Sequence, residues 1–226
     1  KTTSKLLFVL PSNSYMAYSN DNLGTNSVVA QLLAGKVPVL AAADLYLNEH
    51  REYGLSTYSK HSDGTGVAIS SRLRPILNMR PKYRHWLSPS LWQLNADLHL
   101  TDWLEEKNFD FDVVTDEDLH IEGVDLLNRY RCVLTGSHPE YSSEKMLAAY
   151  ESYQLNGGRW IYLGSDGFYW ISEYHPDNTN IIEVRKGEAG TRAWTANPGE
   201  YNNAFDGKYG GMWRARGRIP SKVCGL

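Results

Sequence analysis

Residues 109–163 read FDFDVVTDEDLHIEGVDLLNRYRCVLTGSHPEYSSEKMLAAYESYQLNGGRWIYL, and apolar runs alternate with helical patterns along this stretch. The runs predict three strands, at residues 109–115, 131–135 and 159–163. A helical crossover is expected at residues 116–130, and a longer helix lies between the second and third strands. Strands that alternate with helices are usually parallel and joined by right-handed crossovers. The stretch therefore predicts an open α/β sheet.

The helices of this region have recognisable end signals. Ser142 is the predicted N-cap of the longer helix, and Gly157-Gly158 is its predicted end. An earlier helix is expected to begin at Ser88-Pro89, with Ser as the cap and Pro at the first helical position, and to end near Lys107.

Working outward, residues 6–10 form a continuous apolar run that predicts a buried first strand, closed by a loop that starts at Pro11. Two further strands are expected at residues 168–171 and 181–184. Residues 12–88 have a poor pattern, and such a long irregular segment in a compact domain is usually functional. We expect residues 1–226 to form a single α/β catalytic domain with long loop insertions, as part of a longer polypeptide.

The composition excludes several classes of partner. The 226 residues carry a net charge of −3 with 42% hydrophobic residues, so nothing favours binding to nucleic acid or to an anionic membrane. No run reaches the roughly 18 apolar residues of a membrane span. Cys132 and Cys224 lack metal-binding spacing and are interpreted as free thiols, Cys132 in a buried strand, which favours a reducing, cytoplasmic location.

Polar side chains follow the predicted strands, where ligands bind in open α/β sheets. Tyr15 and Tyr18 follow the first strand, and His138, Glu140 and Tyr141 follow the strand at residues 131–135. The second loop supplies an imidazole, a carboxylate and a phenol, which suit a metal ligand or a general base. The alternatives are a helix-capping role for Glu140 and a sheet-covering role for the two tyrosines.

Other familiar sites are absent from the sequence. It contains no Gly-x-Ser-x-Gly elbow, no phosphate-binding glycine loop after the first strand and no His-Glu-x-x-His motif. Cys132 lies inside a predicted strand rather than at the following turn, which argues against thiol catalysis. A segment rich in Tyr, His and Ser around Tyr53, Tyr58 and His61 is either part of a site or a solvated loop.

Several stretches resemble the large subunit of the N,N-dimethylformamidase family. They are residues 11–20 (PSNSYMAYSN), 70–82 (SSRLRPILNMRPK), 112–120 (DVVTDEDLH) with 133–142 (VLTGSHPEYS), and 190–200 (GTRAWTANPGE). These stretches span most of the chain and occur in the same order as in that family. The resemblance implies the C-terminal part of a longer subunit, with an open, mostly parallel sheet and flanking helices in a flavodoxin-like or class I glutamine-amidotransferase-like layout.

The resemblance also implies one ferric iron, mononuclear, held by two tyrosines and one glutamate. Carried onto this sequence, the ligands are Tyr18, Tyr58 and Glu140, with Tyr53 as the competitor of Tyr58. His138 matches a histidine beside the metal. Phenolate and carboxylate oxygens are hard ligands, as a ferric ion prefers.

The implied activity is hydrolysis of a small amide such as N,N-dimethylformamide to an amine and formate. The iron would polarise the carbonyl and activate a water, and His138, or a carboxylate outside this chain, would move the proton to the leaving amine. A small accessory subunit and a homo-oligomer of the large subunit are the implied partners. Two alternatives stay open: a non-catalytic or sugar-binding amidotransferase-like domain, and a zinc-type hydrolase using His138 and Glu140.

Overall fold

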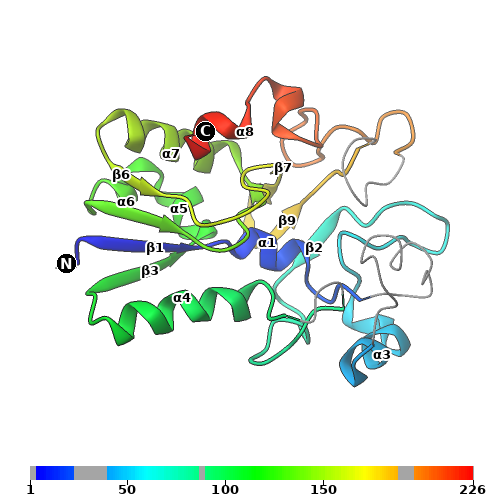
Figure 1. The fold of residues 1–226 in the computed structure, drawn as a ribbon. Coiled ribbons are helices and arrows are strands. Elements are labelled where there is room, and N and C mark those ends of the chain that lie inside the picture. The colour runs from blue at the N-terminus through cyan, green and yellow to red at the C-terminus, as the bar shows by residue number, and fades with distance from the viewer. Residues whose placement is uncertain (1–3, 23–39, 87–89, 188–195, 226) are drawn as a thin grey trace.

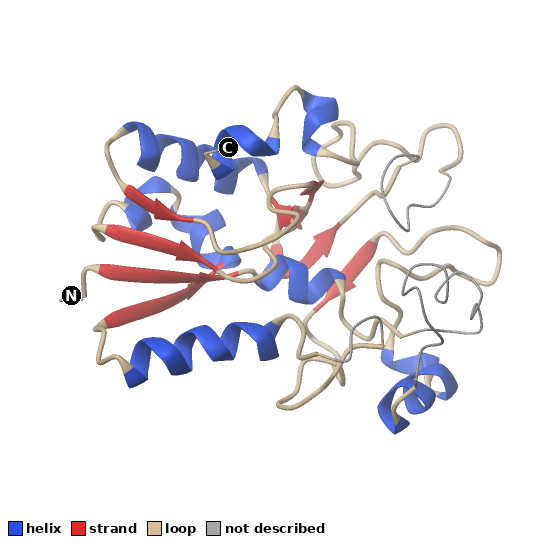
Figure 2. Cartoon of the chain, viewed as in Figure 1, coloured by secondary structure: helices blue, strands red, loops and turns tan. Residues whose placement is uncertain are grey.

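The computed structural model describes residues 4–22, 40–86, 90–187 and 196–225. Its centre is a four-stranded sheet in the order β3-β1-β4-β6, in which every pairing is parallel (Figures 1 and 2). The strands are β1 (Leu6–Leu10), β3 (Phe111–Thr115), β4 (Cys132–Thr135) and β6 (Arg159–Ile161). The predicted open parallel α/β sheet is confirmed, and its order is that of flavodoxin-like folds.

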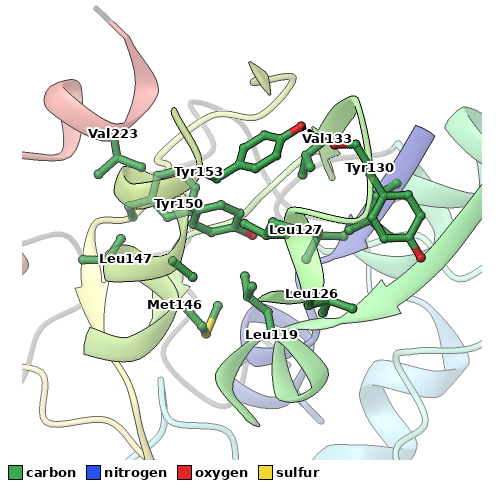
Figure 3. Packing of buried hydrophobic residues seen from close by; sticks show 14 of the residues in the cluster. Leu119, Leu126, Leu127, Tyr130, Val133, Met146, Leu147, Tyr150, Tyr153 and Val223 are labelled. Carbon is green, nitrogen blue, oxygen red and sulfur yellow. Dashed lines mark hydrogen bonds between the residues drawn. The ribbon is translucent and has the colours of Figure 1, made fainter. Parts of the chain in front are cut away.

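The sheet is covered on both faces. Helices α5 (Asp116–Glu122), α6 (Val124–Leu127) and α7 (Glu144–Leu155) lie on one face, and α4 (Leu94–Glu106) lies on the other (Figure 1). Figure 3 shows the core beneath the first group, where Leu119, Leu127 and Leu147 pack with Tyr150 and Val133. This core fixes the parallel strands, and so it fixes the edge from which the functional loops emerge.

Helix α7 begins one residue later than predicted. Its N-cap is Ser143, whose Oγ accepts a hydrogen bond from the Met146 N–H. Ser142 belongs instead to the short strand β5 (Tyr141–Ser142), which pairs with β7 (Trp170–Ile171). The Oγ of Ser142 accepts a hydrogen bond from Trp213 Nε1 at 3.0 Å. The prediction for Ser142 is wrong because the strand pairing delays the helix by one residue.

The start of α4 also differs from the prediction. Ser88 and Pro89 lie outside the described residues, and α4 begins at Leu94. Gln93, at the N-cap, has a φ of 54°, and its side chain makes no capping hydrogen bond. The chain therefore bends sharply just before α4.

The segment after β1 is helical rather than a loop. Helix α1 (Ser12–Ala17) continues directly from β1 and lies at the carboxyl end of the parallel sheet (Figure 1). Beside it is a three-stranded antiparallel sheet of β2 (Ile69–Ser71), β9 (Asn178–Glu183) and β8 (Glu173–His175). Strands β7 and β9 correspond to the predicted strands at residues 168–171 and 181–184, with shifted bounds.

The remaining described elements are short helices and 3-10 turns outside the sheets. They are α3 (Ala42–Glu49), the 3-10 turns η1 (Arg51–Tyr53) and η2 (Trp213–Arg216), and α8 (Pro220–Cys224). Cys132 and Cys224 are free thiols, as predicted, but Cys132 is only partly buried, at the first position of β4. Within the described ranges, no helix has both the length and the apolar character needed to cross a membrane.

Candidate functional site

Three segments that are distant in the sequence bring their side-chain oxygens together beyond the carboxyl end of the sheet. Tyr18 ends α1, Tyr58 lies in the irregular segment, and Glu140 follows β4. The Tyr18 hydroxyl donates to Glu140 Oε2 at 2.8 Å, and the Tyr58 hydroxyl donates to Tyr18 Oη at 2.5 Å. Tyr58 Oη is also 3.3 Å from Glu140 Oε2. The predicted convergence of Tyr18, Tyr58 and Glu140 is therefore present in the structure.

The position of Tyr18 and Glu140 follows from the strand order. The sheet order changes direction between β1 and β4, and ligands of open α/β sheets bind at this switch point. Tyr18 comes from the segment after β1 and Glu140 from the segment after β4. Ser14 ties the two segments together, because its Oγ accepts a hydrogen bond from the Glu140 N–H at 3.1 Å.

Tyr58 reaches the site because its segment is anchored to the end of α1. The carbonyl of Ala17 accepts hydrogen bonds from the Thr57 N–H at 3.2 Å and from the Thr57 hydroxyl at 3.0 Å. Ser56 Oγ donates to the same carbonyl and accepts from the Tyr58 N–H at 3.0 Å. These contacts hold Tyr58 beside Tyr18, with ring centroids 4.4 Å apart.

His138 lies against the carboxylate, as its position in the same loop predicted. Its Nε2 is 3.0 Å from Glu140 Oε2, and its Nδ1 is 3.3 Å from Ser165 Oγ. An ionised carboxylate only accepts hydrogen bonds, so Nε2 carries the proton in this contact. The indole of Trp92 packs on the other side, with its ring centroid 5.1 Å from that of His138.

Two further residues lie at the site, Tyr141, which the sequence named in the candidate loop without a role as ligand, and Lys186, which it did not name. The hydroxyl of Tyr141 donates to Tyr58 Oη at 2.6 Å, and Tyr141 is completely buried. Lys186 is also completely buried, with Nζ 2.7 Å from the centroid of the Tyr58 ring. The position of Tyr141 in the candidate loop pointed to it, whereas Lys186 follows β9 and no local sequence pattern indicates its role.

We use the name oxygen cluster for the side-chain oxygens of Tyr18, Tyr58, Tyr141 and Glu140. Burial raises the pKa of Tyr18 and Tyr58 well above the usual range, and the neighbouring phenol and carboxylate groups raise these pKa values further. Burial also acts to raise the pKa of Glu140, but the hydrogen bond and charge of His138 and the charge of Lys186 hold it below its usual value. The cluster is thus a buried carboxylate that receives hydrogen bonds from phenols.

The other candidate residues lie elsewhere. Tyr53 is not part of the cluster, and its hydroxyl pairs with that of Tyr46 at 3.1 Å in an exposed contact. The hydroxyl of Tyr15 donates to Asp97 on α4. His61 is exposed in a turn, where its backbone N–H donates to the Thr65 carbonyl. Of the two competing tyrosines, Tyr58 is therefore the one whose hydroxyl lies beside Tyr18 and Glu140.

The donor atoms of the cluster suit a hard cation. Phenol and carboxylate oxygens are hard ligands, and those of Tyr18, Tyr58 and Glu140 lie within hydrogen-bonding distance of one another. In the part of the chain that the structure describes, no group of three or more His, Cys, Asp or Glu residues could hold a metal ion. The tyrosine oxygens of the cluster are donors of a different kind, and they lie beside the Glu140 carboxylate.

The fold and the cluster together define a class: flavodoxin-like α/β domains with a buried tyrosine–carboxylate site at the switch point of the sheet. Comparison with known proteins assigns the family. The chain belongs to the family described as N,N-dimethylformamidase beta subunit-like, C-terminal, whose model matches residues 1–226.

Two curated relatives are similar along the whole chain. The N,N-dimethylformamidase beta subunit of Paracoccus aminophilus is 47% identical over 226 residues, which cover 100% of this chain and 29% of the relative. The N,N-dimethylformamidase beta subunit of an Alcaligenes species is 46% identical over 224 residues, covering 99% of this chain and 29% of the relative. The chain thus spans less than a third of the length of these relatives.

Proposed function

We propose that this chain carries the active site of an iron-dependent amidase that hydrolyses small linear amides such as N,N-dimethylformamide to an amine and formate. The convergence of the Tyr18, Tyr58 and Glu140 oxygens is the observation on which the proposal rests. The names of the two relatives support the substrate class.

Tyr18, Tyr58 and Glu140 are the residues that would hold a mononuclear ferric ion. Such an ion, when bound, supplies a Lewis acid and lowers the pKa of water. Two phenolates and a carboxylate carry three negative charges, which match the charge of the ion. Because burial raises the pKa of both tyrosines, they need a nearby cation to lose their protons.

His138 is the group proposed to move the proton to the leaving amine. A glutamate that serves as a ligand cannot also act as a free base, whereas the His138 ring lies directly beside it, with Nε2 3.0 Å from Glu140 Oε2. Ser165 Oγ, 3.3 Å from Nδ1, holds the ring in this orientation. General acid–base groups of this kind typically contribute about 10²–10⁴-fold to a rate.

Lys186 and Tyr141 support the anionic oxygens. The ammonium of Lys186 lies over the Tyr58 ring and lowers the pKa of Glu140. The Tyr141 hydroxyl donates to the oxygen of Tyr58, and this hydrogen bond orients the phenol. The Trp92 ring packs edge-to-face on the Tyr18 ring, with centroids 6.1 Å apart, so the surroundings of the cluster are partly aromatic, as would suit a small substrate with little charge.

The test is elemental analysis and visible spectroscopy of the full-length protein, combined with assays on N,N-dimethylformamide. Ferric tyrosinate absorbs visible light through charge transfer, and a zinc site does not. Tyr18→Phe and Glu140→Gln should each remove the iron and the absorption while the protein stays folded.

Tyr130→Phe is a matched control, because the Tyr130 hydroxyl donates to Asp112 Oδ2 at 2.9 Å in a tyrosine–carboxylate pair away from the cluster. It should retain both the iron and the colour. A colourless, iron-free protein with full activity would reject the iron proposal in favour of a zinc-type hydrolase. A metal-free, inactive full-length protein would instead favour a binding domain.

We further propose that the full-length protein assembles with a second kind of subunit, since both relatives are named as beta subunits. A homo-oligomer of the large subunit is proposed beside it on the family resemblance alone. Co-purification of the tagged full-length protein from its own cells tests this proposal. A protein that remains a single-chain monomer at working concentration would contradict it.

A further inference from the structure

The buried carboxylate of Asp97 does not belong to the oxygen cluster, but it contacts both the segment after β1 and the segment after β4, which carry the site. Asp97 lies in the first part of α4, and 1% of its surface is exposed. Its Oδ2 accepts a hydrogen bond from the Tyr15 hydroxyl, and its Oδ1 accepts one from the Ser137 N–H at 2.5 Å. Asp97 therefore joins α4 to the segments that follow β1 and β4.

Both partners of Asp97 lie shortly before residues of the site in the sequence. Tyr15 is one helical turn before Tyr18 in α1, and Ser137 is the residue before His138. The carboxylate thus holds the helix that ends in Tyr18 and the loop that carries His138 and Glu140 at a fixed separation.

The close approach of the carboxylate depends on a glycine in the loop. A Cβ added at Gly136 would lie 2.8 Å from Asp97 Oδ1 and 2.5 Å from Pro11 Cδ, closer than real Cβ contacts allow. The loop backbone therefore reaches Asp97 and the end of β1 because residue 136 has no side chain.

The carboxylate of Asp97 does not serve its own helix. The Asp97 N–H donates to the Gln93 carbonyl within the first turn, while both side-chain oxygens accept hydrogen bonds from other segments. A buried carboxylate is costly unless its hydrogen bonds are satisfied, and those of Asp97 are satisfied by two other segments, so its contacts join these segments rather than form its own helix.

We propose that Asp97 is a positioning residue of the amidase site, acting through Tyr15 and Ser137 to set the distance between the Tyr18 oxygen and the His138–Glu140 pair. The proposal rests on the proposed function, because a site that must share one ion requires this separation to be fixed. Side-chain partners outside the ligands of a metal typically change its affinity by about 10–100-fold when they are lost.

The test compares Asp97→Asn with Asp44→Asn in the full-length protein. Asp44 is a matched control on α3: it is 2% exposed, and it accepts hydrogen bonds from the Tyr83 hydroxyl at 2.7 Å and the Ala41 N–H at 2.9 Å. Iron affinity, the position of the visible absorption band, kcat and Tm are measured for each.

Asp97→Asn should weaken iron binding by about 10-fold or more, move the absorption band and lower kcat. Asp44→Asn should lower Tm while leaving the iron affinity and the band as in the wild type. Equal iron affinity, band and kcat in the two variants would overturn the proposal, because the carboxylate would then be only structural.

Tyr15→Phe keeps the test decisive if Asp97→Asn does not fold, since it removes one hydroxyl and leaves the Ser137 contact in place. It should shift the band in the same direction by a smaller amount, and an unchanged band and iron affinity would count against Asp97. Wild-type protein without iron would refute the proposed function and the role of Asp97 together. An iron-bound wild type with an unaffected Asp97→Asn variant would refute the role alone.

Discussion

The apolar core is fully buried and the oxygen cluster is mostly buried, but the two are built from opposite chemistry. The apolar core is the set of hydrophobic residues between the sheet and helices α5, α6 and α7, where Leu119, Leu127 and Val133 are completely buried. In the oxygen cluster, Tyr18 and Glu140 are 7% and 6% exposed, and Lys186 beside them is fully buried.

The difference indicates what each region is for. Burying apolar surface stabilises the fold, at about 25 cal/mol per Å². Burying a carboxylate and an ammonium costs free energy that their mutual attraction often fails to repay. A protein that keeps such groups in its interior departs from the best choice for stability, and such departures are expected at functional sites. The predictions below test this division between stability and function.

The largest expected effect concerns two tyrosines of the same segment. Tyr58→Phe should lower kcat/KM by at least about 10³-fold, roughly 4 kcal/mol of activation free energy, because it removes an oxygen of the cluster. Tyr53→Phe should leave activity unchanged, since its hydroxyl contacts only Tyr46 in an exposed pair among the described residues. Steady-state assays and iron analysis of both variants check this, and equal effects of the two would contradict the geometry.

The apolar core should respond in the opposite way. Leu147→Ala removes a side chain that is 1% exposed. It should reduce the free energy of unfolding by about 2–5 kcal/mol, through lost burial and the cavity left behind. Iron content and kcat below the unfolding temperature should not change. Denaturant unfolding measured beside iron analysis tests this, and loss of iron from the folded variant would show that the two regions are coupled.

A pH effect is expected at Asp116, which lies between the two regions. Burial raises the pKa of Asp116 to about 8, despite a hydrogen bond from the Asn13 N–H. The folded protein therefore keeps a proton that the unfolded chain releases near its ordinary pKa of about 4. Between these values the folded state binds more protons, so stability is greatest at low pH and falls as the pH rises toward 8.

Asp116→Asn should remove this part of the pH dependence, because its side-chain oxygen can still accept the Asn13 N–H but cannot ionise. The slope of unfolding free energy against pH should change by at most about 1.4 kcal/mol per pH unit. Denaturant unfolding at several pH values measures the slope. An identical slope in the variant and the wild type would mean that Asp116 does not titrate in this range.

The smallest effect is expected at the N-cap of α7. Ser143→Ala should cost about 1–2 kcal/mol of stability, because the Met146 N–H loses its side-chain acceptor and His120 Nδ1 loses its partner at 2.7 Å. Ser142→Ala should act differently, by removing the Oγ that accepts from Trp213 Nε1. Thermal unfolding together with amide hydrogen exchange in the first turn of α7 separates the two. Faster exchange in that turn for Ser142→Ala than for Ser143→Ala would contradict the cap assignment.

The sequence determined much of the fold because its signals were local. The apolar runs around β1, β3, β4 and β6 each identify a strand by themselves, and their alternation with helices predicts the parallel sheet. The loop with His138 and Glu140 was found for the same reason, since it directly follows a clear strand.

Local sequence patterns predicted the helix boundaries less well than the strands. Ser142 and Ser143 are both good caps, and pairing of β5 with β7 decides that Ser143 is used. The beginning of α4 at Leu94 likewise depends on the chain path before it, where Gln93 has a positive φ.

Only the tertiary structure decided which residues complete the site. Tyr53 and Tyr58 are chemically identical in the sequence, and the anchoring of Ser56 and Thr57 to the Ala17 carbonyl directs Tyr58 inward. Lys186 reaches the cluster from the segment after β9, far along the chain, and Asp97 on α4 joins helix α1 to the loop after β4. Such placements arise from long-range packing and hydrogen bonds, which local sequence patterns do not encode.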